Sequence, residues 1–196
     1  MPSPIRPLAL KPHLDHLYSF YNARHWIHPD PLEFLYNYPN PEDREIVGII
    51  GSSLAYGRVD QILKTVSSVL TRLGPSPYTF LKDTTSDTLH ALFKGFKYRF
   101  TTAEELVRLL TGIQAVIDTF GSLYACFLEG FHVEDETVLN GLCFLTDAIR
   151  SPFDRAANSL IPDPGRGSAC KRLNLFMRWM VRRDAVDPGG WDQVPP

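Results

Sequence analysis

The segment from Ile46 to Tyr56 constrains the fold most, because it is apolar or small on every side. A helix without a polar face is stable only where other elements surround it, so this segment predicts a buried central helix. Asn40 and Pro41 supply the residue types that begin a helix. Gly48 and Gly51 leave room for another backbone or a ligand to approach closely. The rest of the chain must therefore be arranged around this helix.

Elsewhere, apolar residues recur at spacings of three and four, which indicates helices with one buried face. Prolines between residues 29 and 41 exclude a regular helix from that connection. No alternating strand of useful length and no internal repeat is found in the sequence. The pattern predicts an all-α bundle of roughly eight to ten helices. The clearest helices are expected at about 14–21, 59–73, 103–120, 122–128, 138–149 and 168–183.

Composition narrows the class of protein. The chain has 196 residues, is 44% hydrophobic and carries a formal net charge of only -2. It can bury a substantial core, and an anionic partner has to be met by a local patch rather than by a globally basic surface. The three cysteines are too far apart in sequence for zinc or iron–sulfur spacing, so no cofactor is expected.

The same features predict location and organisation. No apolar stretch approaches the roughly 18 residues of a membrane span, and the N-terminus lacks a signal-peptide core, so we expect a cytoplasmic protein without a membrane partner. The length suits one globular helical unit, 1–196. We expect two interleaved subdomains, a central bundle at about 30–150 and a second made of 1–29 with 151–196. The oligomeric state is left open.

Basic residues are concentrated between Gly165 and Arg183, where no acidic residue occurs. Gly165, Gly167 and Ser168 form a turn that leads into a helix, and a helix N-terminus with exposed backbone N–H groups binds phosphate. The alternative is a solvated basic face that stabilises the C-terminal end of a helix. The cations of the segment are Arg166, Lys171, Arg172, Arg178, Arg182 and Arg183.

Lys171 lies near the start of that helix, where the positive end of the helix dipole disfavours an ammonium. Partial burial would favour the neutral amine still further, and a neutral amine can displace a base from a sugar and form a Schiff base. The alternative is an ordinary surface lysine.

Two other segments combine aromatic and basic residues. Tyr56 and Arg58 follow the central helix, and they could contact a base and a phosphate. In the segment 94–100, lysine and arginine alternate with aromatic residues, which also suits nucleic-acid binding. The alternatives are a helix–helix turn with Tyr56 in the core and a loop with buried aromatic residues.

The segment from Pro162 to Asn174 resembles the hairpin and second helix of the helix-hairpin-helix base-excision DNA glycosylases. Lys171 matches the position of the catalytic lysine, although two additional residues separate it from the glycine pair. The segment from Ile46 to Gln61 is similar to the early helix and the turn that carry a base-displacing residue in that superfamily, here Tyr56 or a neighbour.

The whole chain also resembles a bacterial family of conserved domains of unknown function that is placed in this superfamily. The resemblance implies an all-α glycosylase fold and binding of duplex DNA with a damaged base, and it implies no particular substrate. It rests on Asp30–Leu32, Ala55–Val59, Gly95–Phe100 and Gly167–Arg182.

One departure from the superfamily affects the expected activity. The superfamily carries an aspartate in an Asp-Thr-His or Asp-Val-His setting after the lysine helix, and this chain reaches Pro196 without that motif. The aspartate would stabilise positive charge on the sugar or deprotonate the nucleophile. We therefore expect this chain to be C-terminally truncated or a degenerate relative, and not a competent glycosylase as it stands.

Three interpretations remain open. The first is a DNA glycosylase, with or without lyase activity, that uses Lys171 as nucleophile. The second is a nucleic-acid-binding module without catalysis, and the third is a helical protein-interaction domain. For the first two, the DNA-binding residues are expected to be Gly165, Gly167, Ser168, Arg172, Arg178, Tyr56 and Arg58.

Overall fold

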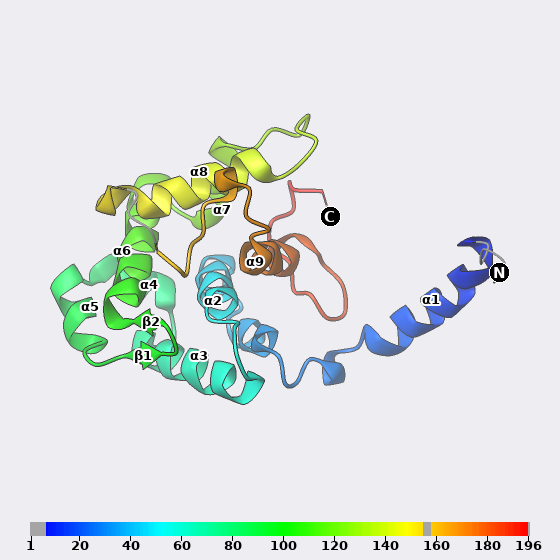
Figure 1. Ribbon diagram of the computed structural model, residues 1–196, viewed down its shortest axis with the longest axis horizontal. Helices are drawn as coiled ribbons and strands as arrows, with labels where there is room; N and C mark the ends of the chain where they lie inside the picture. Colours follow the sequence, from blue (N-terminus) through cyan, green and yellow to red (C-terminus); the bar gives the residue numbers. More distant parts are fainter. Residues whose placement is uncertain (1–6, 155–157, 196) are drawn as a thin grey trace.

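The computed structural model describes residues 7–154 and 158–195, and helices dominate it (Figure 1). The prediction of an all-α protein is confirmed. A two-stranded antiparallel hairpin pairs β1 (Lys97–Tyr98) with β2 (Thr101–Thr102). The α-helices in the described residues are α1 (Pro7–Tyr21), α2 (Pro41–Ser53), α3 (Val59–Leu73), α4 (Pro77–Asp83), α5 (Ser86–Leu92), α6 (Ala103–Phe120), α7 (Leu123–Glu129), α8 (Leu139–Arg150) and α9 (Lys171–Val181). Short 3-10 helices are η1 (Arg24–Trp26), η2 (Pro31–Asn37), η3 (Ser151–Phe153) and η4 (Pro164–Arg166).

Helix α2 is the predicted central helix, and every residue from Glu45 to Ser53 is buried. It packs against α9, and the missing side chain of Gly48 allows this close approach. A Cβ atom on Gly48 would lie 3.1 Å from Met180 Cε, and one on Gly51 would lie 3.6 Å from a ring carbon of Trp179. The expectation of a close neighbour at these glycines is therefore confirmed, and the neighbour is α9.

Most helix boundaries agree with the sequence pattern. Helix α3 covers 59–73 and ends at Gly74. Helix α6 begins with a capping box in which Thr102 and Glu105 exchange side-chain and backbone hydrogen bonds. Helix α5 was not predicted, because its seven residues are too short to show a helical period.

The predicted range of the last helix, 168–183, is wrong at both ends. Helix α9 begins at Lys171 because Gly167 and Cys170 have positive φ angles of 72° and 43°, which place them outside a right-handed helix. It ends at Val181 because the following Arg182 is extended. The turn residues Gly167 and Ser168 are thus separated from the helix by two further residues.

Helices α6, α7 and α8 pack together beside α2, and α1 projects away from this body (Figure 1). Several apolar side chains of α1 are consequently exposed, among them Leu14, Leu17 and Tyr21. In the described residues, no single helix is long and apolar enough to cross a membrane; α6 and α7 pass that test only as a pair bent by 70°.

One buried carboxylate joins three parts of the chain. Glu45 of α2 accepts hydrogen bonds from the backbone N–H groups of Leu123 and Tyr124, at 2.6 and 3.0 Å, at the start of α7. It also accepts one from Trp191 Nε1, at 3.2 Å, near the end of the described chain. Burial raises the pKa of Glu45 to about 7, although these three donors favour the charged form.

We expect Gly112→Ala to destabilise the protein far more than Gly51→Ala does. A Cβ on Gly112 would overlap the backbone oxygen of Ile149 in α8, whereas one on Gly51 makes ordinary van der Waals contact. Overpacking costs roughly 1–3 kcal/mol, while an accommodated alanine in a helix gains about 1 kcal/mol over glycine. Urea unfolding of both variants measures the difference, and equal stabilities would contradict this account of the α6–α8 contact.

Glu45 should also make stability depend on pH. Its folded pKa of about 7 lies above the ordinary 4.5, so the folded state binds the proton more tightly. This contribution to stability is complete below about pH 4.5 and is lost as the pH rises through 7, by roughly 3 kcal/mol in all. In Glu45→Gln the free energy of unfolding should no longer fall between pH 5 and 8, whatever the absolute stability of the variant. An unchanged pH profile in urea titrations would be evidence against the assignment.

Candidate functional site

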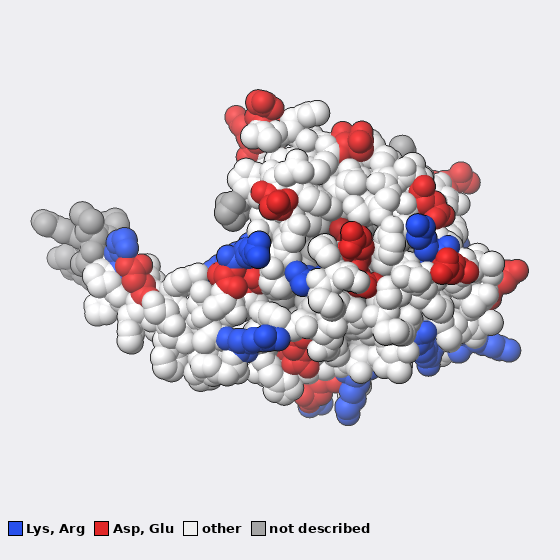
Figure 2. Space-filling view, turned by 180° about the vertical axis from the view of Figure 1, so that it is seen from behind, with Lys and Arg blue, Asp and Glu red and all other residues white. Residues whose placement is uncertain are grey.

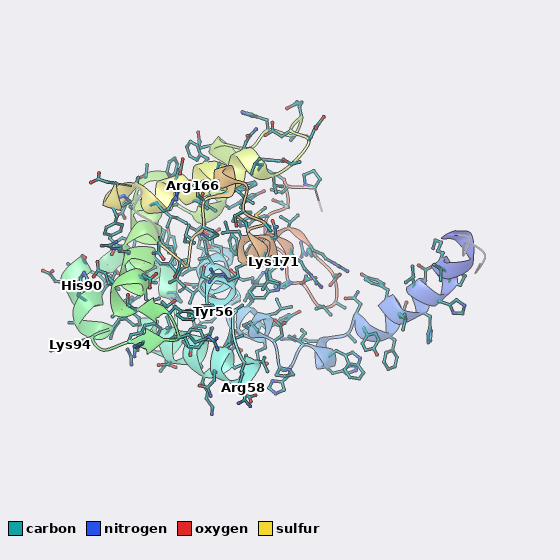
Figure 3. The ribbon with its side chains drawn as sticks, viewed as in Figure 1. Tyr56, Arg58, His90, Lys94, Arg166 and Lys171 are labelled. Carbon is teal, nitrogen blue, oxygen red and sulfur yellow. The ribbon has the colours of Figure 1, made fainter. Side chains whose placement is uncertain are left out.

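The sequence-predicted site residues separate into two groups in the structure. Tyr56 and Arg172 lie together at the end of α2, and Arg58 follows two residues later as the N-cap of α3, whereas Gly165, Gly167, Ser168 and Arg178 do not share these surroundings. In Figure 3, Tyr56 lies centrally below α9, and Arg58 lies at the start of α3. Arg166 lies beside α8, well away from Tyr56 in the same view.

Arg172 is the link between α9 and the Tyr56 turn. Its guanidinium donates to the backbone oxygen of Ser53 at 2.5 Å and to that of Ser159, and its Cζ lies 5.2 Å from the centre of the Tyr56 ring. Burial lowers the pKa of Arg172, and attraction to Tyr56 opposes that shift. The side chain therefore holds segments together and also places a positive charge beside an aromatic ring.

Tyr56 is half-buried and connects the turn to the β-hairpin. Its hydroxyl lies 3.0 Å from the backbone oxygen of Tyr98 and 2.6 Å from Thr101 Oγ1. In return, the hydroxyl of Tyr98 donates to the backbone oxygen of Tyr56. These bonds fix the hairpin against the turn that follows α2.

The hairpin presents Phe100, whose side chain is 80% exposed. It occupies the two-residue turn with Arg99, which has a positive φ of 51°. The Arg99 side chain extends over Gly57, since a Cβ there would lie 3.0 Å from Arg99 Cδ. The ring lies in the same cavity wall as Tyr56 and Arg172, so an exposed apolar surface there adjoins an aromatic ring and a guanidinium.

A cavity of about 280 Å³ opens between these elements, lined by Tyr56, Phe100, Ser159 and Arg172. Arg58 and Arg99 flank the same turn. Among the described residues, neither they nor Arg172 form an ion pair with a carboxylate. We call Tyr56, Arg58, Arg99, Phe100 and Arg172 the Tyr56–Phe100 surface.

In the basic segment, in contrast, three of the six cations pair with acids from outside it. Arg178 Nε lies 3.2 Å from Asp187 Oδ2, and Arg182 Nε lies 2.6 Å from Asp184 Oδ2. Arg166 Nε lies 3.3 Å from Asp163 Oδ2. The view in Figure 2 likewise shows lysine and arginine interspersed with acidic residues.

Lys171 is the first residue of α9, and it is exposed. The partial burial that would activate its amine is therefore not found in the free protein. The segment before it forms the short 3-10 helix η4, in which Asp163 Oδ1 accepts from Gly165 N at 2.9 Å and the left-handed Gly167 ends the turn. Its Gly165, Gly167 and Ser168 are all exposed.

Sequence reasoning missed Ser159, which lies in a segment without any pattern. It identified Phe100 and Arg99 only as members of a basic and aromatic run. Their sequence signal was the alternation itself, and the hairpin that exposes them has only two residues in each strand. Among the described residues, no group of three histidine, cysteine or acidic side chains is placed to hold a metal ion.

These features define an all-α protein with a cavity beside an exposed aromatic hairpin. A family model described as "Protein of unknown function (DUF2400)" matches residues 30–196, and the chain belongs to that family. Helix α1 precedes the matched region. No curated protein and no solved structure matches the chain.

Proposed function

We propose that the protein binds DNA through the Tyr56–Phe100 surface, as a helix-hairpin-helix glycosylase-like protein. The observation that carries the proposal is the 80% exposed Phe100 beside a cavity walled by Tyr56 and Arg172. Apolar side chains inserted between base steps unstack and kink a duplex, and an unstacked base needs an aromatic or cationic face to rest on. The cavity offers both.

The charges support the same partner. Arg172 lies beside the Tyr56 ring, and Arg58 and Arg99 flank Gly57, which follows Tyr56. Among the described residues, none of the three arginines forms an ion pair with a carboxylate, so each can pair with phosphate, although Glu105 binds Ser159 in the wall of the same cavity. A chain with a formal net charge of -2 has to bind an anionic polymer through such a local group. The resemblance to the glycosylase superfamily favours duplex DNA with a damaged base as the ligand.

Phe100→Ala should weaken binding to a duplex that contains one abasic site about tenfold or more, because stacking contributes roughly 1–3 kcal/mol per base. The dependence of affinity on salt should not change, since the substitution removes no charge. Fluorescence anisotropy with a labelled duplex measures both quantities. Phe100→Trp should retain binding.

Val133→Ala is the matched control, because Val133 is an apolar residue 71% exposed in the connection between α7 and α8. Equal losses of DNA affinity in Phe100→Ala and Val133→Ala would show that Phe100 does not belong to the interface. Absence of any binding at low salt would contradict the proposed function itself.

A catalytic role for Lys171 is a second candidate. The favouring observation is that Lys171 directly precedes Arg172, which lines the cavity. Its neutral amine would attack C1′ of the sugar, and the bond from C1′ to the base would break with its electron pair on the base, which takes up a proton. The attacking nitrogen would lose a proton to solvent. Its lone pair would then form the C1′=N bond as the C1′–O4′ bond breaks and O4′ takes up a proton. The resulting Schiff base would be the hallmark of lyase chemistry.

Borohydride reduction in the presence of abasic and damaged duplexes should then trap a covalent adduct with the wild-type chain. Lys171→Ala should abolish the adduct and leave the affinity for DNA within about twofold of that of the wild-type chain, because one exposed lysine contributes little to the affinity at moderate salt. Fluorescence anisotropy measures this affinity. Lys94→Ala, an exposed lysine that lies away from Tyr56 in Figure 3, is the control. Absence of an adduct across all lesions would leave a DNA-binding protein that does no chemistry through Lys171.

A further inference from the structure

A second cavity, of about 150 Å³, lies where the end of α1 and the segment 26–32 meet α9. It does not involve the Tyr56–Phe100 surface, and nothing in the proposed function uses it. Its lining includes Tyr21, Trp26, Asp30, Leu175, Arg178 and Trp179. It therefore combines three aromatic side chains with one carboxylate.

The aromatic part of the cavity is fixed in place while its rings stay accessible. Trp26 is 47% exposed and Tyr21 is 56% exposed, with ring centres 5.5 Å apart. Trp26 Nε1 donates to the backbone oxygen of Phe20 at 3.1 Å, which holds the indole in this orientation. Trp179, by contrast, is buried in the core and cannot move aside. Accessible tyrosine and tryptophan faces attract cations through the ring quadrupole.

Three carboxylates, those of Asp30, Glu33 and Asp187, lie at or near the cavity, against the two guanidiniums of Arg178 and Arg182, which both contact Asp187. Asp30 Oδ1 accepts from Leu32 N at 2.8 Å, and the charges that act on Asp30 are those of Arg178, Asp187 and Glu33. Arg178 directs its Nε to Asp187 Oδ2. Asp187 is wholly buried, and its Oδ1 has no hydrogen-bond partner among the described residues. The neighbourhood of Asp30 thus holds more negative than positive charge, and burial raises the pKa of Asp30.

We propose that this cavity binds a primary alkylammonium group, of the kind that a lysine side chain or a polyamine carries. The ammonium would donate to Asp30 and offset the excess negative charge, and the alkyl chain would lie along Trp26 and Tyr21. A carboxylate or phosphate ligand is disfavoured, because Arg178 already pairs with Asp187 and Asp30 would repel an anion.

The test uses n-butylammonium as probe and n-butanol as its neutral counterpart, since both have the same apolar part. Titration of the full chain is followed by the NMR signal of the Trp26 indole N–H, which lies at the cavity. Butylammonium should give a saturable shift with a dissociation constant about tenfold or more below that of butanol, as expected for a cation–π contact with a charged hydrogen bond. Equal binding of the two probes, or no saturable shift with butylammonium, would overturn the proposal.

The substitution Asp30→Asn removes the negative charge and keeps a side chain that can cap η2. Asparagine is as good an N-cap as aspartate, so the bond from Leu32 N and the start of η2 should persist. Binding of butylammonium should weaken about tenfold in Asp30→Asn and stay unchanged in Asp15→Asn, which makes the same change on an exposed residue of α1. Unweakened binding in Asp30→Asn would also overturn the proposal. The affinity for DNA should be the same in Asp30→Asn, Asp15→Asn and the wild-type chain. Loss of the butylammonium site would therefore leave the proposed DNA binding untouched, and the two proposals can fail separately.

Discussion

The carboxylate of Glu45 is the constraint on which the arrangement of the helices depends. It lies inside the core, and it accepts three hydrogen bonds from groups that are 78 to 146 residues away in sequence. A buried carboxylate without such donors would cost several kcal/mol. Displacement of α7 or Trp191 from Glu45 would therefore cause a large loss of stability. Trp191 in turn stacks near Tyr124 and Phe127, with ring centres 5.2 and 5.1 Å away. Helix α2, the start of α7 and the segment around Trp191 are therefore held together at the Glu45 carboxylate.

The second constraint is the contact between α2 and α9. Because Gly48 carries no side chain, α9 packs closely on α2, and Arg172 of α9 reaches the backbone oxygen of Ser53. That bond places a guanidinium beside Tyr56. The cavity at the Tyr56–Phe100 surface thus depends on the packing of α9 on α2, with the β-hairpin and Ser159 completing its wall.

Electrostatics decides which cations are available for a partner. Counted along the sequence, the segment from Gly165 to Arg183 is the most basic part of the chain. In the fold, Asp163, Asp184 and Asp187 lie against it and pair with three of its arginines. Arg58 and Arg99, which are less prominent in the sequence, lie at a turn and a hairpin, and neither forms an ion pair among the described residues. The candidate interface therefore moves from the α9 face to the hairpin.

The sequence by itself determined the helical class, the central position of α2 and most helix ends. These follow from local rules: apolar periodicity, capping residues such as Thr102, and glycines that stop a helix. Only the tertiary structure decided the start of α9, the burial of Glu45, the pairing of the basic segment and the exposure of Phe100. The start of α9 follows from the left-handed backbone at Cys170, a residue type that does not signal such a conformation. The other features depend on which distant residues come together, such as Glu45 with Trp191 or Arg178 with Asp187, and no local pattern in the chain encodes such a pairing.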